Sequence, residues 1–334
     1  MFVDTLVDLI VARARTDATA PDPGNLRNGW RTDALFQDVD NYIVISRKLP
    51  AVYADVGRGV LEQVRDLPEM ETLAMLAIFR GERLLPINAE REEHLVRMVE
   101  ELVGAVDCLP EGTRKLRCQS LLDYHAGVFV EACGRFEVAA GLQCKSAQMA
   151  ERLGDKAGVA IARFCEVWNL LKHALKGGGS DAEFQSQFSA LEQAFGRMSQ
   201  DLAGSALQVQ WAEGNGPASM IEACVWLNKY PDSWSTWLKK TLTASGQLGE
   251  AFTPSAQLVR ALDLVYLGDV RADEALGGIA NSDDIPERRA TALLVLARLA
   301  LSAGKREEAE NIVQSMPRQG AQHICVIARR MLGR

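Results

Sequence analysis

The sequence predicts an all-α fold, an α-solenoid of stacked antiparallel helical hairpins with irregular repeats. Three features favour it. Leu and Ala dominate the apolar residues, and both favour helices. Apolar residues recur at steps of three and four, whereas the alternation typical of strands is rare. Glycines separate these periodic stretches, and two short helices joined by a turn must stack on neighbours to bury their apolar faces.

Residues 1–112 are expected to form an acidic, N-terminal helical region. In Met1–Arg15 acidic residues break the apolar run and the arginines follow it, which indicates a helix and not a secretion signal. A polar loop is expected over Thr16–Gly29, since it contains prolines and glycines. Helices are expected over 33–48 and Val52–Arg65.

Prolines and a capping residue divide the rest of that region. Pro68 is expected to open a helix over Glu69–Phe79, and Asn88 to cap the next helix. The apolar residues of this second helix form a single stripe, namely Leu95, Met98, Val99, Leu102, Val103 and Val106. A Pro-Glu-Gly joint ending at Gly112 leads into the next region.

Residues 113–179 form a central region with a helix–turn–helix–turn–helix pattern. Gly134 is expected to take a positive φ between the first two helices. Gly154 and Asp155 close the second helix. The third runs to Gly177–Gly179, the clearest break in the chain.

The spacing in this region resembles a tetratricopeptide (TPR) repeat, most clearly over 116–176. The resemblance rests on small and large residues at set offsets, namely Gly127, Gly134, Phe136, Ala139, Ala147, Leu153, Gly154 and Asp155. Val130, Gln143 and Ser146 depart from the family pattern. A weaker resemblance lies over 286–332, and together the two imply an irregular array of TPR-like hairpins.

The C-terminal region, 180–334, is expected to hold further, irregular TPR-like repeats. Ser180 begins a capping-box pattern in front of a helix with one apolar face. A glycine-rich break is expected at Gly214–Pro217. Glycine turns at Gly268 and Gly304 complete two more hairpins.

Charge is unevenly distributed along the chain. Residues 1–112 carry 12 basic and 20 acidic groups, a net charge of −8. Residues 113–179 carry 10 basic and 6 acidic groups, a net charge of +4. This is either ordinary surface variation or a basic surface for an acidic peptide or for the acidic N-terminal region of the same chain.

The seven cysteines are odd in number and lack the spacing of a zinc site. We expect buried thiols in a reducing, cytoplasmic and bacterial-type compartment. We expect no cofactor and no metal. No apolar run approaches the length of a membrane span, so we expect no membrane contact. The acidic balance of the chain disfavours nucleic acid as a partner.

No pattern typical of catalysis stands out. The sequence lacks a P-loop, a His-Glu-x-x-His pair and a nucleophile elbow. Cys118, His125 and Cys133 fall at seven- and eight-residue steps, where they are either packing residues or a Cys–His pair that needs a thiolate-stabilising environment. We therefore expect that the protein is not an enzyme, with an enzyme of unfamiliar site as the third alternative.

Two sets of residues are candidates for binding a partner. The resemblance implies a groove lined by the first helix of each hairpin, here Leu121, Tyr124, His125, Val128, Phe164 and Trp168. These side chains favour an apolar partner segment, such as a helix or loop, over an acidic peptide.

The second set is an aromatic cluster, Trp226, Tyr230, Trp234 and Trp237, with lysines beside it. Clustered Trp and Tyr are typical of recognition hot spots. They also fill irregular space between helical hairpins. The pattern leaves both interpretations open.

The sequence thus predicts a scaffold, adaptor or inhibitory subunit of a larger complex, which binds a partner segment through a helical-repeat surface. The alternative is a regulatory or sensory module that controls an effector enzyme, a protease or nuclease, in bacterial signalling or antiviral defence. The breaks at Gly177–Gly179 and Gly214–Pro217 would then act as hinges.

Overall fold

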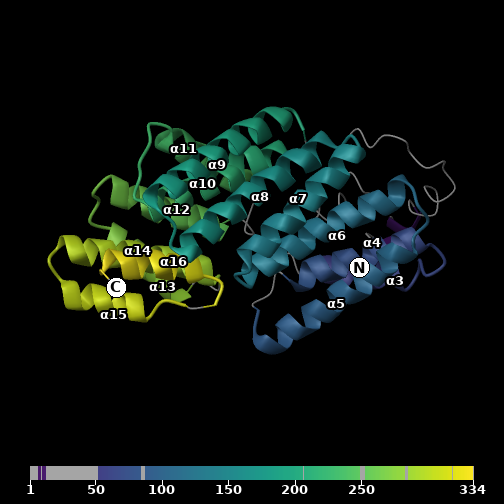
Figure 1. Cartoon of the computed structure of the whole chain (residues 1–334), viewed down its shortest axis with the longest axis horizontal. Helices are drawn as coiled ribbons and strands as arrows, with labels where there is room; N and C mark the ends of the chain where they lie inside the picture. The colour runs from purple at the N-terminus through teal and green to yellow at the C-terminus, as the bar shows by residue number, and fades with distance from the viewer. Residues whose placement is uncertain are drawn as a thin grey trace. The chain divides into compact units, whose positions relative to one another are not determined.

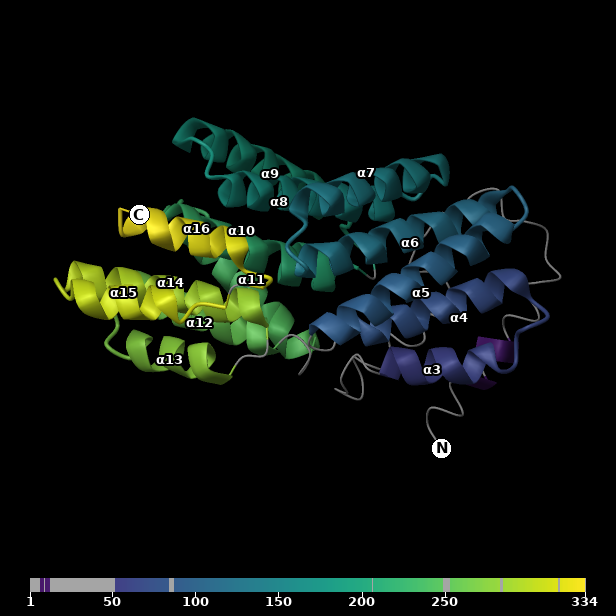
Figure 2. The ribbon, with the colours of Figure 1, turned by 60° about the horizontal axis from the view of Figure 1, so that its bottom comes forward.

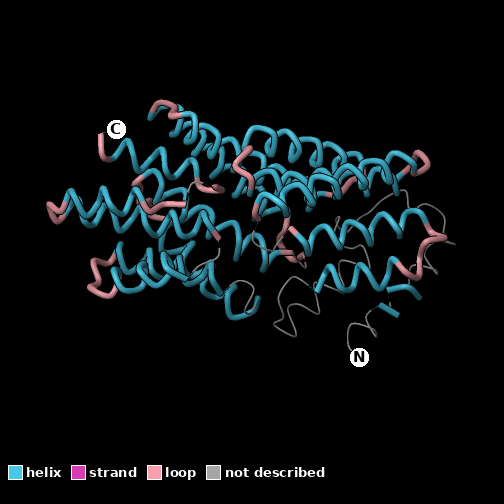
Figure 3. Tube along the Cα trace, turned by 90° about the horizontal axis from the view of Figure 1, so that it is seen from below, coloured by secondary structure: helices cyan, strands magenta, loops and turns pink. Residues whose placement is uncertain are grey.

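The computed structural model describes residues 7–8, 10–12, 52–83, 87–205, 207–248, 253–282, 285–317 and 319–333. Over these residues the chain is built from α-helices and one π-helical segment, with no strand (Figures 1 and 3). The predicted all-α fold is therefore confirmed. The loop expected over Thr16–Gly29 and the helix expected over 33–48 lie outside the described residues.

The chain forms two compact units. The N-terminal unit holds the described residues up to Val130 together with Val138–Glu166, and the C-terminal unit holds Glu131–Glu137 and the residues from Val167 onward. The division passes through the central region 113–179. The three regions expected from sequence stay a prediction.

The N-terminal unit stacks its helices in chain order, with α3 against α4 and α4 against α5. The predicted cap is confirmed, because Asn88 Oδ1 accepts a hydrogen bond from the backbone N–H of Arg91 at 2.8 Å. The helices that contribute to this unit are α3 (Val52–Leu61), α4 (Pro68–Glu82), α5 (Ala89–Cys108), α6 (Thr113–Ala132), α7 (Phe136–Arg152) and α8 (Lys156–Gly177).

Acidic and basic residues of this unit pair with each other. Glu69 on α4 forms ion pairs with Arg114 and Arg117 on α6. Of the alternatives that the charge distribution left open, these two ion pairs fit a contact between the acidic N-terminal region and the basic central region. The exposed fraction of the Glu69 side chain is only 14%, so this carboxylate is largely covered.

Two of the three residues that depart from the TPR-like pattern, Gln143 and Ser146, form hydrogen bonds between α6 and α7. Gln143 Nε2 donates to the carbonyl of Tyr124 at 3.1 Å. Ser146 Oγ donates to the carbonyl of Ser120 at 2.9 Å. A Cβ on Gly127 would lie 2.6 Å from Gln143 Nε2, so the glycine makes room for that side chain.

The predicted glycine turns end their helices in left-handed backbone. Gly154 has φ 70° and Gly304 has φ 75°, as expected for the residue after a helix. At each turn the backbone N–H of the residue after the glycine donates to the carbonyl five positions earlier. Asp155 donates to Ala150 and Lys305 donates to Ala300, both at 2.9 Å. This is the Schellman pattern, which satisfies the last carbonyls of the helix.

The C-terminal unit contains the end of α8 and the remaining helices. From α10 to α15 each helix packs on the next, and α16 packs on α14 and lies near α10 (Figure 2). The bounds are α9 (Asp181–Asp201), the π-helical η1 (Gln208–Asn215), α10 (Gly216–Leu227), α11 (Trp234–Leu248), α12 (Thr253–Tyr266), α13 (Ala272–Ser282), α14 (Pro286–Ser302), α15 (Arg306–Gln314) and α16 (Gln322–Met331).

The break expected at Gly214–Pro217 is wrong, because η1 runs directly into α10. Pro217 lies in the first turn of α10, a position that accepts proline. A Cβ on Gly216 would lie 2.7 Å from the Phe195 ring and 2.7 Å from the carbonyl oxygen of Trp211. The glycine therefore serves close packing and not a hinge.

The break at Gly177–Gly179 is confirmed as a helix end. Gly178 has φ 73°, and α8 stops at Gly177. Arg330 of α16 donates to the carbonyls of Gly178 and Gly179. These contacts tie the segment to the last helix of the same unit.

Candidate functional site

The six residues predicted to line a groove are mostly core residues. Five are buried, with Leu121 and His125 fully covered, and Val128 is half-buried. Trp168 belongs to the C-terminal unit, whereas the others belong to the N-terminal unit. Buried side chains offer a partner little surface, so we do not carry this set into the proposed function.

His125 contacts Arg83 and Tyr124. Its Nδ1 lies 3.0 Å from Nη2 of Arg83. Because a guanidinium only donates, this ring nitrogen accepts. The ring also meets the edge of Tyr124, with centroids 5.2 Å apart. These contacts favour a packing role for His125.

The predicted aromatic cluster divides into core and surface. Trp226, Trp234 and Trp237 are buried, which fits the packing interpretation. Trp226 Nε1 donates to Thr291 Oγ1 at 3.0 Å, so its polar end is satisfied inside the unit. Tyr230 is 40% exposed and belongs to the surface.

Tyr230 lies in an exposed apolar surface that we call the Tyr230 patch, formed by Tyr230, Tyr266, Leu267 and Val270. Their exposed fractions are 40%, 50%, 67% and 94%. The rings of Tyr230 and Tyr266 have centroids 5.4 Å apart, and both contact the buried ring of Trp234. Leu267 and Val270 follow in the turn between α12 and α13.

Hydrogen bonds lie beside the patch on both sides. Arg298 donates to the carbonyls of Val225 and Trp226 at the end of α10, and Asn228 then takes left-handed backbone with φ 53°. On the other side, Arg271 donates two side-chain hydrogen bonds to Asp269, at 3.0 and 2.6 Å. These bonds hold the pKa of Asp269 low, at about 2.

The same unit contains a buried ion cluster that sequence reasoning missed. The side chain of Lys172 on α8 is 2% exposed, and its Nζ donates to Glu131 and to Glu287 at 2.7 Å each. Trp168 Nε1 also donates to Glu131, at 3.1 Å. The cluster joins the end of α6, α8 and the start of α14.

Aromatic rings surround this ammonium. Its Nζ lies 4.7 Å from the ring centroid of Trp168 and 5.7 and 5.8 Å from those of Phe136 and Trp226. His323 of α16 is fully buried and meets Phe136 and Trp226 edge-on, with centroids 5.0 and 4.7 Å apart. Neither of its ring nitrogens has a hydrogen-bond partner among the described residues.

Burial and charge set the protonation of these groups. Burial lowers the pKa of Lys172, but the two carboxylates outweigh it, so the net shift is upward. Burial raises the pKa of Glu287. The Lys172 ammonium lowers it, but the effect of burial is larger. Burial, together with the ammonium groups of Lys172 and Lys176, lowers the pKa of His323 well below its usual value. A protonated, doubly paired lysine is no nucleophile, so we assign this cluster a structural role.

A signal for this cluster is present in the sequence. Lys172 lies four residues after Trp168 and seven after Cys165, on the apolar face of α8. A lysine on that face implies a buried partner. The partners lie 41 and 115 residues away in the chain, so spacing alone does not identify them.

No family model, curated protein or solved structure shows significant similarity to this chain. In the described part of the chain, no helix combines the length and apolar character needed to cross a membrane. The same residues hold no cluster of three or more His, Cys, Asp or Glu side chains that could bind a metal ion. The TPR-like resemblance stays a prediction.

Proposed function

We propose that the protein is an interaction subunit, a scaffold, adaptor or inhibitory subunit, that binds a partner protein through the Tyr230 patch. The observation that carries this proposal is the contact between the exposed rings of Tyr230 and Tyr266, with the exposed side chains of Leu267 and Val270 following Tyr266 in the chain. Aromatic residues with an exposed face and a buried support are typical of interface hot spots. Here Trp234 supplies that support.

The composition of the patch favours an apolar partner segment, since all four of its side chains are aromatic or aliphatic. Of the charged groups nearby, Asp269 and Arg271 pair with each other, and the carboxylate of Asp263 accepts a hydrogen bond from Trp234 Nε1 at 3.4 Å. The patch therefore offers aromatic and aliphatic contacts. The partner is thus expected to present an apolar helix or loop.

The test uses the full chain as bait in an extract of its native host. Three bait variants are compared with the native chain by quantitative mass spectrometry. Leu267→Asp and Val270→Asp place a charge on the patch, and Val138→Asp is the matched control on α7, where the valine is 54% exposed. All three positions are exposed, so each variant is expected to fold.

Support requires a partner that the native and Val138→Asp baits retain and that both patch variants lose. Direct binding of the purified partner must show the same order of affinities. A partner that all four baits retain equally would contradict the proposal.

We do not extend the regulatory alternative, since both segments proposed as hinges are held by helix packing or by Arg330. We keep the expectation of a reducing, cytoplasmic compartment, which the seven cysteines support. In the described residues they are present as thiols.

A further inference from the structure

The N-terminal unit contains a surface pocket of about 300 Å³ between α3, α4 and α5. Its apolar lining includes Met75 and Ile78 of α4 and Met98 and Leu102 of α5. Within each helix these residues are three or four positions apart and share one face. Leu102 is 1% exposed and forms part of the base of the pocket. Methionine side chains are flexible and suit a surface that adapts to an apolar group.

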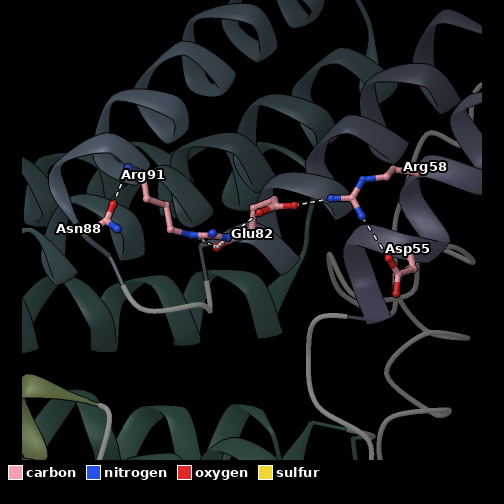
Figure 4. Close-up of polar contacts among 5 residues, drawn as sticks. All are labelled: Asp55, Arg58, Glu82, Asn88 and Arg91. Atoms are coloured by element: carbon pink, nitrogen blue, oxygen red, sulfur yellow. Dashed lines mark hydrogen bonds and ion pairs between the residues drawn. The ribbon is translucent and has the colours of Figure 1, made fainter.

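The pocket walls are joined by an ion network near the end of α4 (Figure 4). Glu82 pairs with Arg58 of α3 and with Arg91 of α5. Arg91 also donates to the backbone carbonyl of Glu82, at 2.7 Å through Nη2. Arg58 in turn pairs with Asp55 at 3.1 Å. One carboxylate thus connects all three helices.

Two glycines bring α3 and α4 into close contact. A Cβ on Gly57 would lie 2.8 Å from the carbonyl oxygen of Ala74, and a Cβ on Gly81 would lie 2.5 Å from the backbone nitrogen of Ala54. A larger residue at either position would push α3 and α4 apart, and the Arg58–Glu82 ion pair links the two helices. A pocket with fixed walls loses less entropy when it is occupied.

The rim of the pocket is mainly acidic. It carries Glu71 of α4, Glu101 of α5 and Arg65, which follows α3. Neither of these glutamates has an ion pair within the described residues, whereas Glu69 and Glu82 on α4 are paired. The α5 helix itself has six acidic and two basic residues. The rim therefore favours a cation beside the apolar pocket.

We propose that this pocket binds a basic segment of a partner protein, with one large apolar side chain in the pocket and a neighbouring lysine or arginine at Glu71 and Glu101. The site is distinct from the Tyr230 patch, and the experiments on one site do not test the proposal for the other. Its selectivity comes from two adjacent features, since the apolar lining accepts an apolar side chain and the two carboxylates accept the neighbouring cation.

Methyl-methionine NMR of the full chain tests the proposal, since two of its nine methionines line the pocket. Met75→Leu and Met98→Leu assign the two signals. The probe is the peptide acetyl-Gly-Lys-Leu-Lys-Gly amide. One control peptide has serine in place of leucine, and a second has glutamates in place of the lysines. Pentylammonium, a small molecule with both an alkyl chain and a positive charge, tests whether a peptide is needed.

The expected result is a saturable shift of the Met75 and Met98 signals with the lysine–leucine peptide and a weaker response to each control. Glu71→Gln and Glu101→Gln should each weaken binding about two- to fivefold, as for an exposed ion pair. Arg65→Gln is the matched control and should not weaken it, because it removes a like charge. Helical circular dichroism verifies that each variant is folded.

Three results would overturn the proposal. The first is the absence of a saturable shift at either methionine. The second is equal binding of the glutamate peptide, which would remove the role of Glu71 and Glu101. The third is binding of pentylammonium as tight as that of the peptide, which would identify a small-molecule site instead.

Discussion

Replacing Lys172 with Met should destabilise the protein by about 3–5 kcal/mol, the usual cost of removing one partner of a buried ion pair. The ammonium lies 2.7 Å from each of two carboxylates. At an effective dielectric constant of about 20, a unit charge pair at that separation attracts by about 6 kcal/mol. Burying the ammonium offsets part of this attraction. Without it, Glu131 and Glu287 repel each other across an apolar space.

Urea unfolding monitored by far-UV circular dichroism measures the loss. Lys305→Met is the matched control, because Lys305 pairs with Glu308 at 3.1 Å with 62% of its side chain exposed. Exposed pairs of this kind contribute about 0–1 kcal/mol. Adding Glu131→Gln and Glu287→Gln to Lys172→Met should recover part of the stability, since no unpaired charge remains.

A loss below about 1 kcal/mol for Lys172→Met, equal to that of the control, would refute this reasoning. So would a triple variant that is less stable than the single one. Either result would mean that the cluster is solvated in solution and does not hold α8 against α14.

Three further predictions concern local structure. Gly134→Val should lower the free energy of unfolding, measured in urea, more than Gly304→Val does. Both glycines have positive φ, which strains a valine. A Cβ at position 134 would in addition meet the side chain of Gln322, whereas one at position 304 would meet open space. Asn88→Ala should cost about 1 kcal/mol through the lost cap, and Asn88→Asp should restore it. His323→Phe should flatten the dependence of stability on pH between 7 and 5. The native imidazole has a lowered pKa, so the unfolded state binds more protons than the folded state. As the pH decreases below about 6.5, the free energy of unfolding of the native protein should therefore decrease, by up to about 1.4 kcal/mol per pH unit. An unchanged pH profile in this variant would show that His323 is not the group responsible.

Local features of the fold follow from sequence because their causes are local. The turn at Gly154, the cap at Asn88 and the capping residue Ser180 each depend on a side chain and backbone within a few residues. Glycine and proline at Gly214–Pro217 misled the prediction, since the same residues also serve close packing and the first turn of a helix.

The candidate sites depend on residues far apart in the chain, which spacing does not reveal. Trp226 and Tyr230 lie one helical turn apart in sequence, yet one is buried and the other exposed, because α10 ends between them. Tyr266, Leu267 and Val270 complete the patch from the end of α12 and the turn that follows. Their gathering required the packing of α10, α11 and α12.

Site-specific photo-crosslinking tests the central claim most directly. A benzophenone amino acid replaces Val270 in the patch or Val138 on α7, and each full-length chain is irradiated in cells of its native host. The account predicts a discrete crosslinked partner from position 270 that is absent from position 138, and its loss when Leu267→Asp is added. Identical crosslinks from both positions, or none from position 270, would contradict the claim that the Tyr230 patch is the partner-binding surface.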